Sequence, residues 1–178
     1  MSSQGVKMVV LCEDSQHRVF IYRLLKAFGL HRRLRMEVAQ EGEGAADQWV
    51  REKYPDEVAV CRRSTMAVGL VTAIDADENS VRFRYRQLDK ELDANDLDQR
   101  RNDEQICLLV PKRNIETWIY ALLGEEVNER DGYPKLEKES ECQPAVEKLV
   151  DYLRHGVPND LIPSLKRGCR ELNNRLPE

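Results

Sequence analysis

The sequence predicts an α/β domain in which a mostly parallel sheet is flanked by helices on both faces, with extra helices at the C-terminal end. Three short apolar runs, at residues 6–12, 68–74 and 106–110, are bounded by polar residues, as in strands buried in a parallel sheet. A segment with apolar residues at helical spacing follows each run. Strands that alternate with helices favour parallel pairing, because the helix supplies the crossover to the next strand. We expect the 178 residues to form one domain.

The first strand, at residues 6–12, is followed by Glu13 and then by a helix. Asp14 or Ser15 is expected to cap this helix, and Gly29 is a typical C-terminal stop. The helix carries one apolar stripe at helical spacing, made of Phe20, Leu24, Ala27 and Phe28.

The next unit is shorter and less regular. Residues 35–39 predict a short second strand, and residues 45–54 a helix with Trp49 and Val50 as apolar anchors. Residues 58–66 are ambiguous between helix and strand.

The segment that follows Ser80 has two interpretations. Its first six residues, Val-Arg-Phe-Arg-Tyr-Arg, alternate as in a strand. Over a longer window the helical spacing persists, at Val81, Tyr85, Leu88 and Leu92. The longer period predicts a helix capped by Ser80. Arg82, Arg84 and Arg86 would then lie off its apolar stripe, near acidic residues.

The strand at residues 106–110 is followed by a strongly apolar helix at 115–123, which completes a core of about residues 6–123. The last third is expected to hold a flexible insertion at 124–142 and, within residues 143–178, two C-terminal helices at 144–155 and 163–176.

Charge and cysteine usage limit the classes of function. The net charge is −4, yet the acid-free stretch from 15 to 36 holds six basic residues, including Arg18. Such a segment is a candidate phosphate-contacting face or an ordinary solvated helix face. The odd number of cysteines, five, without a Cys-x-x-Cys pair argues for a reducing cytoplasm. With neither an 18-residue apolar run nor a signal-peptide pattern, we expect no membrane insertion and a cytoplasmic location.

Two carboxylates, Asp75 and Asp77, follow the strand at 68–74. Because side chains alternate along a strand, both are expected to face one point beyond its carboxyl end, where α/β sheets place ligands. Their mutual repulsion would be relieved by a hard divalent cation such as Mg2+ or Mn2+. The alternative is that they solvate a turn and cap the next helix.

Two further strand ends carry marked residues. Glu13 follows the first strand, and Lys112, Arg113 and Glu116 follow the last. Acidic metal ligands beside basic residues suit phosphodiester chemistry. Additional candidate substrate contacts lie nearby in the sequence, namely His17, Arg18 and Arg82. His17 is a candidate phosphate contact or base, although an exposed helix histidine is the commoner case.

At these strand ends the sequence resembles the TOPRIM domain. In that family a glutamate follows the first strand and an Asp-x-Asp follows a later one, positions that Glu13, Asp75 and Asp77 match. Residues 111–118, Pro-Lys-Arg-Asn-Ile-Glu-Thr-Trp, resemble the P-x-R-x-I-E-x-W element of small standalone TOPRIM-like proteins related to OLD-family nucleases. Asp14 stands where many TOPRIM domains have glycine. The resemblance leaves the last third of the chain uncovered.

The resemblance implies a Rossmann-like fold and a Mg2+-dependent nuclease or phosphotransfer subunit that acts on DNA or RNA. It implies that the metal is held by Glu13, Asp75 and Asp77. Glu116 and Lys112 would assist catalysis, and Arg113 would contact the phosphate. Similar small proteins often belong to bacterial antiphage systems beside an ATPase of the ABC or SMC type. We therefore expect nucleic acid and such an ATPase as partners, and a homo-oligomer stays open.

Two other classes of function compete with this one. A phospho-acceptor receiver domain also carries acids after its first strand, an aspartate after its third and a lysine after its fifth, which Asp14, Asp75 and Lys112 fit loosely. The separation of Asp14 and Asp75 is longer than short loops require, and that scheme has no use for Asp77. The third class is a non-catalytic sensor subunit of a defence complex, with a vestigial metal site.

Overall fold

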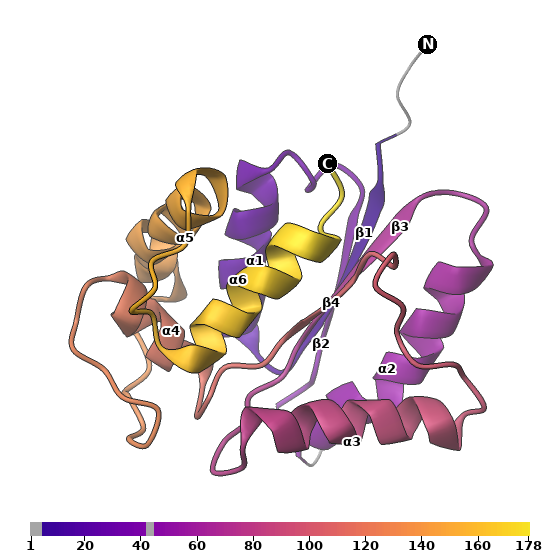
Figure 1. The fold of residues 1–178 in the computed structure, drawn as a ribbon, viewed down its shortest axis with the longest axis horizontal. Helices are drawn as coiled ribbons and strands as arrows, with labels where there is room; N and C mark the ends of the chain where they lie inside the picture. The colour runs from indigo at the N-terminus through magenta and orange to yellow at the C-terminus, as the bar shows by residue number, and fades with distance from the viewer. Residues whose placement is uncertain (1–4, 42–44) are drawn as a thin grey trace.

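A four-stranded sheet forms the centre of the protein, for which a computed structural model describes residues 5–41 and 45–178 (Figure 1). The strands are β1 (Lys7–Cys12), β2 (Leu34–Val38), β3 (Val68–Ala73) and β4 (Ile106–Leu109). Their order across the sheet is β2-β1-β3-β4, and every neighbouring pair is parallel. The predicted class, an α/β fold with a parallel sheet, is confirmed.

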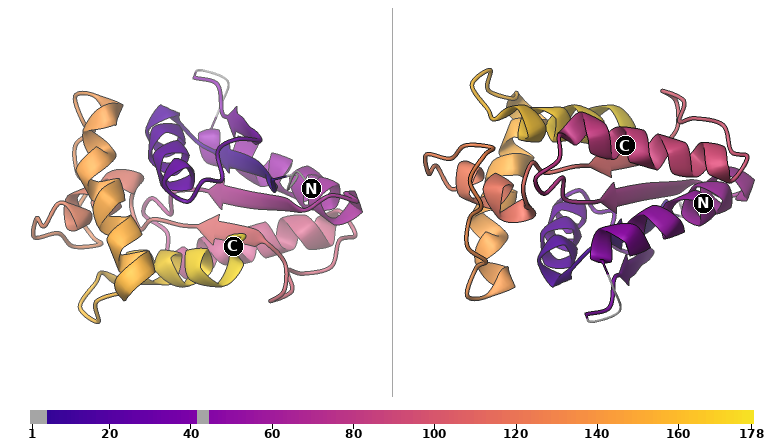
Figure 2. Two further views of the ribbon diagram at one scale, coloured as in Figure 1. Left: turned by 90° about the horizontal axis from the view of Figure 1, so that it is seen from above. Right: turned by 90° about the horizontal axis from the view of Figure 1, so that it is seen from below.

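Helices cover both faces of the sheet, as the views along it show (Figure 2). One face is covered by α1 (Ser15–Ala27), α4 (Ile115–Leu122), α5 (Gln143–His155) and α6 (Pro163–Arg175). The other face is covered by α2 (Ala46–Arg63) and α3 (Val81–Ala94). Along β1, Met8 and Val10 face the first layer while Val9 and Leu11 face the second, and all four are fully buried. Because both faces of this strand are buried, its sequence is a continuous apolar run.

Helix α2 is longer than the sequence predicts. The expected helix stopped at residue 54, whereas α2 continues through Pro55 to Arg63. Pro55 cannot donate the usual backbone hydrogen bond. Tyr54 and Val58, on either side of it, are fully buried in the core cluster under the sheet, and this packing keeps the segment helical.

Helix α3 confirms the choice of the helical period over the strand period. The Ser80 hydroxyl accepts a hydrogen bond from the backbone N–H of Phe83 at 3.0 Å, as an N-cap does. The prediction that Arg84 lies off the apolar stripe is wrong, because Arg84 is 2% exposed. Positions 81, 84 and 88 share one helix face, so Arg84 lies on the stripe itself.

The C-terminal helices share the core of the first layer. The Trp118 ring of α4 is fully buried and donates from its Nε1 to the Ser164 hydroxyl of α6 at 2.8 Å. Between α4 and α5 the chain makes a turn at residues 128–131 and a 3₁₀ helix, η1 (Glu139–Cys142). Glu129 accepts a hydrogen bond from the backbone N–H of Ser164, so this segment is tied to α6. Its flexibility stays a prediction. Within the described ranges, no helix has the length and apolar character needed to cross a membrane.

Candidate functional site

The carboxyl ends of β1, β3 and β4 meet at one edge of the sheet, because the strands are parallel. Ala76 N–H donates to the carbonyl of Pro111 at 2.8 Å, and Asp77 N–H donates to the carbonyl of Arg113 at 3.0 Å. The loops after β3 and β4 therefore run side by side. The strand-end residues marked by the sequence lie in one region of the molecule.

A buried histidine joins two of these loops. His17, in the first turn of α1, is fully buried, and its Nδ1 lies 2.8 Å from Asp14 Oδ1 while its Nε2 lies 3.0 Å from Asp75 Oδ1. Asp14 also caps α1 by accepting from the backbone N–H of His17 at 2.9 Å. The expectation of an exposed helix histidine is wrong. With both ring nitrogens engaged by carboxylates, His17 positions Asp75 rather than facing solvent.

Glu13 braces the loop that follows β3. Its carboxylate accepts a hydrogen bond from the backbone N–H of Asp75 at 2.5 Å. This contact fixes the distance between the ends of β1 and β3, which are adjacent strands. It also leaves the Glu13 carboxylate close enough to Asp75 for the two charges to repel each other.

Asp75 and Asp77 diverge, in contrast to the simple alternation that the strand pattern suggested. Asp77 has a φ of +52°, a left-handed conformation that ends the extended run. Its carboxylate turns toward α3, where Arg84 Nη2 lies 3.3 Å from Asp77 Oδ2. Arg84 also donates to the Asp75 carbonyl at 3.0 Å and to the Asp47 carboxylate at 2.9 Å. One buried guanidinium therefore holds the whole turn.

The basic residues after β4 act on the same turn. Lys112 Nζ donates to the carbonyls of Asp77 and Asn79 at 3.1 and 2.6 Å. Arg113 has a φ of +70° and lies 3.7 Å from the exposed Glu78 carboxylate. In this arrangement Lys112 supports the backbone of the Asp75–Asp77 loop and lies at its exposed side.

Glu116 enters the site from the first turn of α4. It is 2% exposed, and within residues 5–41 and 45–178 its buried Oε1 has no hydrogen-bond partner. A buried carboxylate oxygen without a partner is costly and requires an explanation. Its position in the field of Asp75, Asp14 and His17 places it in the same electrostatic cluster.

The pKa values of these acids are raised by burial and by the negative charges of their neighbours. Burial, with the added repulsion of Asp75, raises the pKa of Glu13 to about 8. Burial also raises the pKa of Asp75, although His17 opposes this, and burial and the Asp75 charge raise the pKa of Asp77. The pKa of Glu116 is raised by burial.

The Asp14–His17 pair behaves in the opposite way. Burial would raise the pKa of Asp14, but the hydrogen bonds and charge of His17 bring it down to about 2. Burial would lower the pKa of His17, but the carboxylates of Asp75 and Asp14 raise it well above its usual value. The pair is therefore charged on both sides, and His17 carries positive charge into the acidic cluster.

The donor chemistry of this cluster fits a hard divalent cation. The acids supply only oxygen ligands, four of them have raised pKa values, and Glu116 Oε1 is an unused buried oxygen. In the part of the chain that the structure describes, no three His, Cys, Asp or Glu side chains form a ready-made metal cage. Mg2+ does not need such a cage, because it keeps most of its waters and uses one or two protein carboxylates.

Two predicted substrate contacts lie outside this cluster. Arg18 is exposed on α1, next to the buried His17 in sequence. Arg82 is exposed on α3 and lines a hollow with Tyr85 and Arg167, away from the carboxylates.

Two residues that support the site, Asp47 and Arg84, were not among the candidates predicted from the sequence. The signal for Arg84 was present in the helical spacing, since its position falls between Val81 and Leu88 on the buried face. Asp47 had no comparable signal, because its pairing with Arg84 depends on how α2 and α3 pack. In three comparisons, no protein family, curated protein or solved structure matched the chain.

Proposed function

We propose that this protein is a metal-dependent phosphodiesterase that acts on DNA or RNA, with its site at the carboxyl edge of the sheet. The observation that carries the proposal is the gathering of Glu13, Asp75 and Glu116, from the segments that follow β1, β3 and β4, into one buried, electrostatically coupled cluster. Like charges kept together in this way weaken a fold, so they are typical of sites that bind a cation or move a proton.

The proposal assigns a role to each group. Glu13, Asp75 and Asp77 would hold Mg2+ or Mn2+, which neutralises charge on the phosphate and lowers the pKa of a bound water. Glu116 would accept a proton or a hydrogen bond through its unused Oε1. His17 keeps Asp75 oriented, as a second layer of contacts does in metal sites.

Lys112 and Arg113 would contact the substrate phosphate in this scheme. Both lie at the exposed side of the loop that carries Asp77, and Lys112 can exchange its carbonyl partners for a phosphate oxygen without crossing a buried layer. Arg113 can offer a bidentate pair of donors.

The resemblance to TOPRIM-like proteins supports the same chemistry and extends it to a cellular role. We propose that the protein works in the cytoplasm, in an antiphage system with an ATPase partner. The described cysteines are all free, as in proteins of a reducing compartment: Cys12, Cys61, Cys107, Cys142 and Cys169.

A receiver-type phosphotransfer is less well supported. The Asp75 side chain is 10% exposed and its Oδ1 is held by His17, so a phosphodonor has poor access to it. Lys112 is bonded to backbone carbonyls instead of the aspartate that would carry a phosphoryl group.

The first experiment is calorimetric titration of Mg2+ and Mn2+ into the wild-type protein and into the variants Glu13→Gln and Asp75→Asn. These substitutions keep the shape of the side chain. We expect binding by the wild type and a loss of at least about tenfold in affinity in each variant. Asp160→Asn is a matched control, because Asp160 is exposed and lies between α5 and α6.

The second experiment tests cleavage of single-stranded and duplex DNA and RNA in Mn2+ and in Mg2+. We expect metal-dependent cleavage that EDTA stops and that Asp75→Asn reduces by at least about a hundredfold. Full cleavage by Asp75→Asn would reject the proposed site. Metal binding without cleavage of any substrate would favour the non-catalytic sensor subunit.

A further inference from the structure

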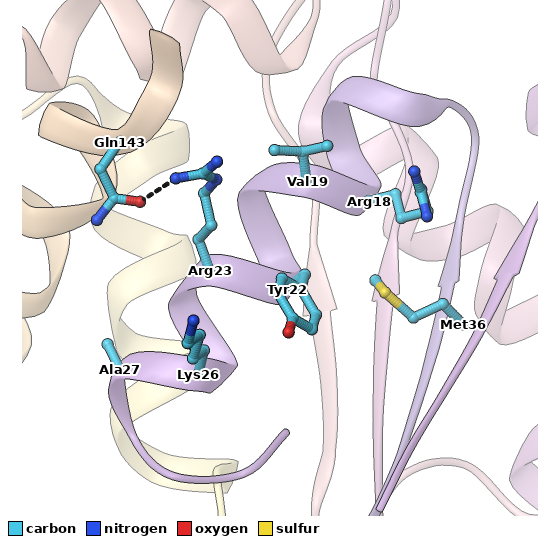
Figure 3. A pocket seen from close by; sticks show the side chains of 8 residues that line it. All are labelled: Arg18, Val19, Tyr22, Arg23, Lys26, Ala27, Met36 and Gln143. Atoms are coloured by element: carbon cyan, nitrogen blue, oxygen red, sulfur yellow. Dashed lines mark hydrogen bonds between the residues drawn. The ribbon is translucent and has the colours of Figure 1, made fainter. Parts of the chain in front are cut away.

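A hollow lies between helix α1 and the edge strand β2, and Gln143 of α5 borders it. It has a volume of about 790 Å³. Figure 3 shows α1 side chains along one wall and Met36 reaching toward them from β2. The lining residues are Arg18, Val19, Tyr22, Arg23, Lys26, Ala27, Met36 and Gln143.

The wall formed by α1 carries three cations, of which Arg18 lies in the electrostatic field of Glu139. Arg18, Tyr22 and Lys26 are four residues apart and so occupy one face of the helix. Across the described parts of the chain, no carboxylate lies within ion-pair distance of Arg18, Arg23 or Lys26. Arg23 is held in the wall by Gln143, to which it donates at 2.6 Å (Figure 3). The hollow therefore attracts anions.

The hollow also offers an aromatic ring and apolar surface. Tyr22 is 39% exposed, and its ring lies edge-on to His31 with the centroids 6.4 Å apart. Val19 and Met36 are half-buried beside it. An exposed ring between cations is how proteins bind unpaired bases and their phosphates together. A duplex presents its phosphates but keeps its base faces stacked, so it would leave the ring unused.

A second hollow lies at the same α1–β2 boundary, nearer the carboxyl edge of the sheet. It has a volume of about 420 Å³, and its lining includes three acids, one base and two residues of the α1–β2 boundary, namely Glu13, Asp14, Glu41, Lys135, Ser15 and Val38. Ser15 is one turn before Arg18 on α1, and Val38 is two residues after Met36 on the same side of β2. The two hollows therefore follow one seam, which leads from Lys26 to the candidate metal ligand Glu13.

We propose that this seam between α1 and β2, called the α1 groove, binds single-stranded nucleic acid and guides it to the carboxyl edge. Arg18, Arg23 and Lys26 contact phosphates, and Tyr22 stacks on a base. The guiding role rests on the proposed phosphodiesterase function, whereas the binding itself can be measured without it.

A second basic surface, between α3 and α6, is a weaker candidate. There Arg100 and Arg175 are paired with Glu171, and Arg167 lies 3.6 Å above the centroid of the Tyr85 ring. The ring and two of the cations are thus already occupied. This surface instead supplies matched controls.

The test is fluorescence anisotropy of labelled oligo(dT) and oligo(rU) of about 12 nucleotides in EDTA, which prevents metal-dependent cleavage. With three phosphate contacts, the slope of log K against log salt should be near −2. Lys26→Gln should make the slope shallower by about 0.7, and Tyr22→Ala should weaken binding by about fivefold or more. A duplex of the same length should bind more weakly and be insensitive to Tyr22→Ala.

The controls are Phe83→Ala and Arg170→Gln, which remove an exposed aromatic ring on α3 and an exposed cation on α6. Neither should change the affinity. The proposal is overturned if the wild type does not bind, if the Tyr22 and Lys26 variants bind as the wild type does, or if the controls lose as much affinity. Tighter binding of either oligomer supports it and shows whether the groove prefers oligo(dT) or oligo(rU).

Failure of this proposal and failure of the proposed function give different results. If groove variants lose binding but the wild type cleaves no bound strand in Mn2+, the binding role of the α1 groove is supported and the phosphodiesterase function is rejected. If the wild type cleaves in Mn2+ and the Tyr22→Ala and Lys26→Gln variants bind and cleave equally well, the phosphodiesterase function is supported and the binding role of the α1 groove is rejected.

Discussion

Two clusters of buried charge lie on this sheet, and they are built in opposite ways. At the β4 edge, Glu171 accepts from Arg100 at 2.7 Å and from the backbone N–H of Leu108 at 2.9 Å, and Arg175 lies 3.5 Å away. At the carboxyl edge, Glu13, Asp75 and Glu116 all have raised pKa values.

The β4-edge cluster has a structural explanation that needs no ligand. The carboxylate of Glu171 and the hydroxyl of Tyr85 occupy the N–H and C=O of Leu108. An edge strand blocked in this way cannot pair with another chain. Every buried charge there meets an opposite one, so nothing is left for a partner to satisfy.

The carboxyl-edge cluster lacks that balance. Acids outnumber the bases that reach them, one buried oxygen has no partner among the described residues, and Asp77 and Arg113 adopt left-handed conformations. The difference teaches that buried charge alone does not identify a functional site. Charge that the fold leaves uncompensated is the more specific sign.

The largest expected effect on stability is at the β4-edge cluster. Glu171→Ala leaves Arg100, which is 11% exposed, without its partner and frees the Leu108 N–H, so we expect a loss of about 3 kcal/mol or more in unfolding free energy. For a chain of this size that is a fall of about 6–12 °C in Tm, measured by calorimetry. Asp160→Ala should change stability by less than about 0.5 kcal/mol. An unchanged Tm in Glu171→Ala would contradict the structural role.

An intermediate effect with the opposite sign is expected at Glu13. Its pKa rises from 4.5 to about 8 in the folded protein, so the folded state binds more protons and stability falls as pH rises across that interval. Glu13→Gln keeps the acceptor for the Asp75 N–H and removes the charge. We expect this variant to be more stable than the wild type at pH 8 by at least about 1.4 kcal/mol, the equivalent of one pKa unit, and similar at pH 4. Urea unfolding at both pH values measures it.

A variant that loses stability at pH 8 would show that the Glu13 charge is compensated in the fold. Saturating Mg2+ should cancel the advantage of the variant, because a ligand at about 100 times its Kd stabilises the wild type by about 2.7 kcal/mol.

The smallest effect is expected at Asp14. Asp14→Asn keeps an N-cap oxygen for α1 and removes only the charge that faces His17. Because the pKa of Asp14 is lowered to about 2, its carboxylate stabilises the fold above its usual pKa, and this stabilisation is lost as pH falls toward 2. With allowance for screening of a side chain that is 35% exposed, the variant should be about 1 kcal/mol less stable at pH 6. The difference should vanish near pH 2 in denaturant titrations, and a constant difference would contradict the ionic contact.

The sequence predicted the elements whose patterns are local. The apolar runs at β1, β3 and β4 identified buried strands, and the spacing of Tyr85, Leu88 and Leu92 identified α3 against a competing strand pattern. The position of Glu13 and Asp75 directly after strands was sufficient to place them at one edge, because parallel strands share that edge.

Packing decided what the sequence left open. Helix α2 continues through Pro55 because Tyr54 and Val58 are buried on the sheet, a contact that lies outside any local window. For the same reason, the end predicted from the sequence, residue 54, is nine residues short of Arg63, where α2 ends.

The sequence by itself therefore determined the α/β class, the parallel sheet and the gathering of acids at its carboxyl edge. Only the tertiary structure decided that His17 is buried between Asp14 and Asp75 and that Arg84 binds the turn from the other layer. These contacts join residues 58 and nine positions apart in the sequence. Local sequence preferences decide whether a residue lies in a helix, a strand or a loop. Which residue its side chain contacts depends on how the helices pack on the sheet.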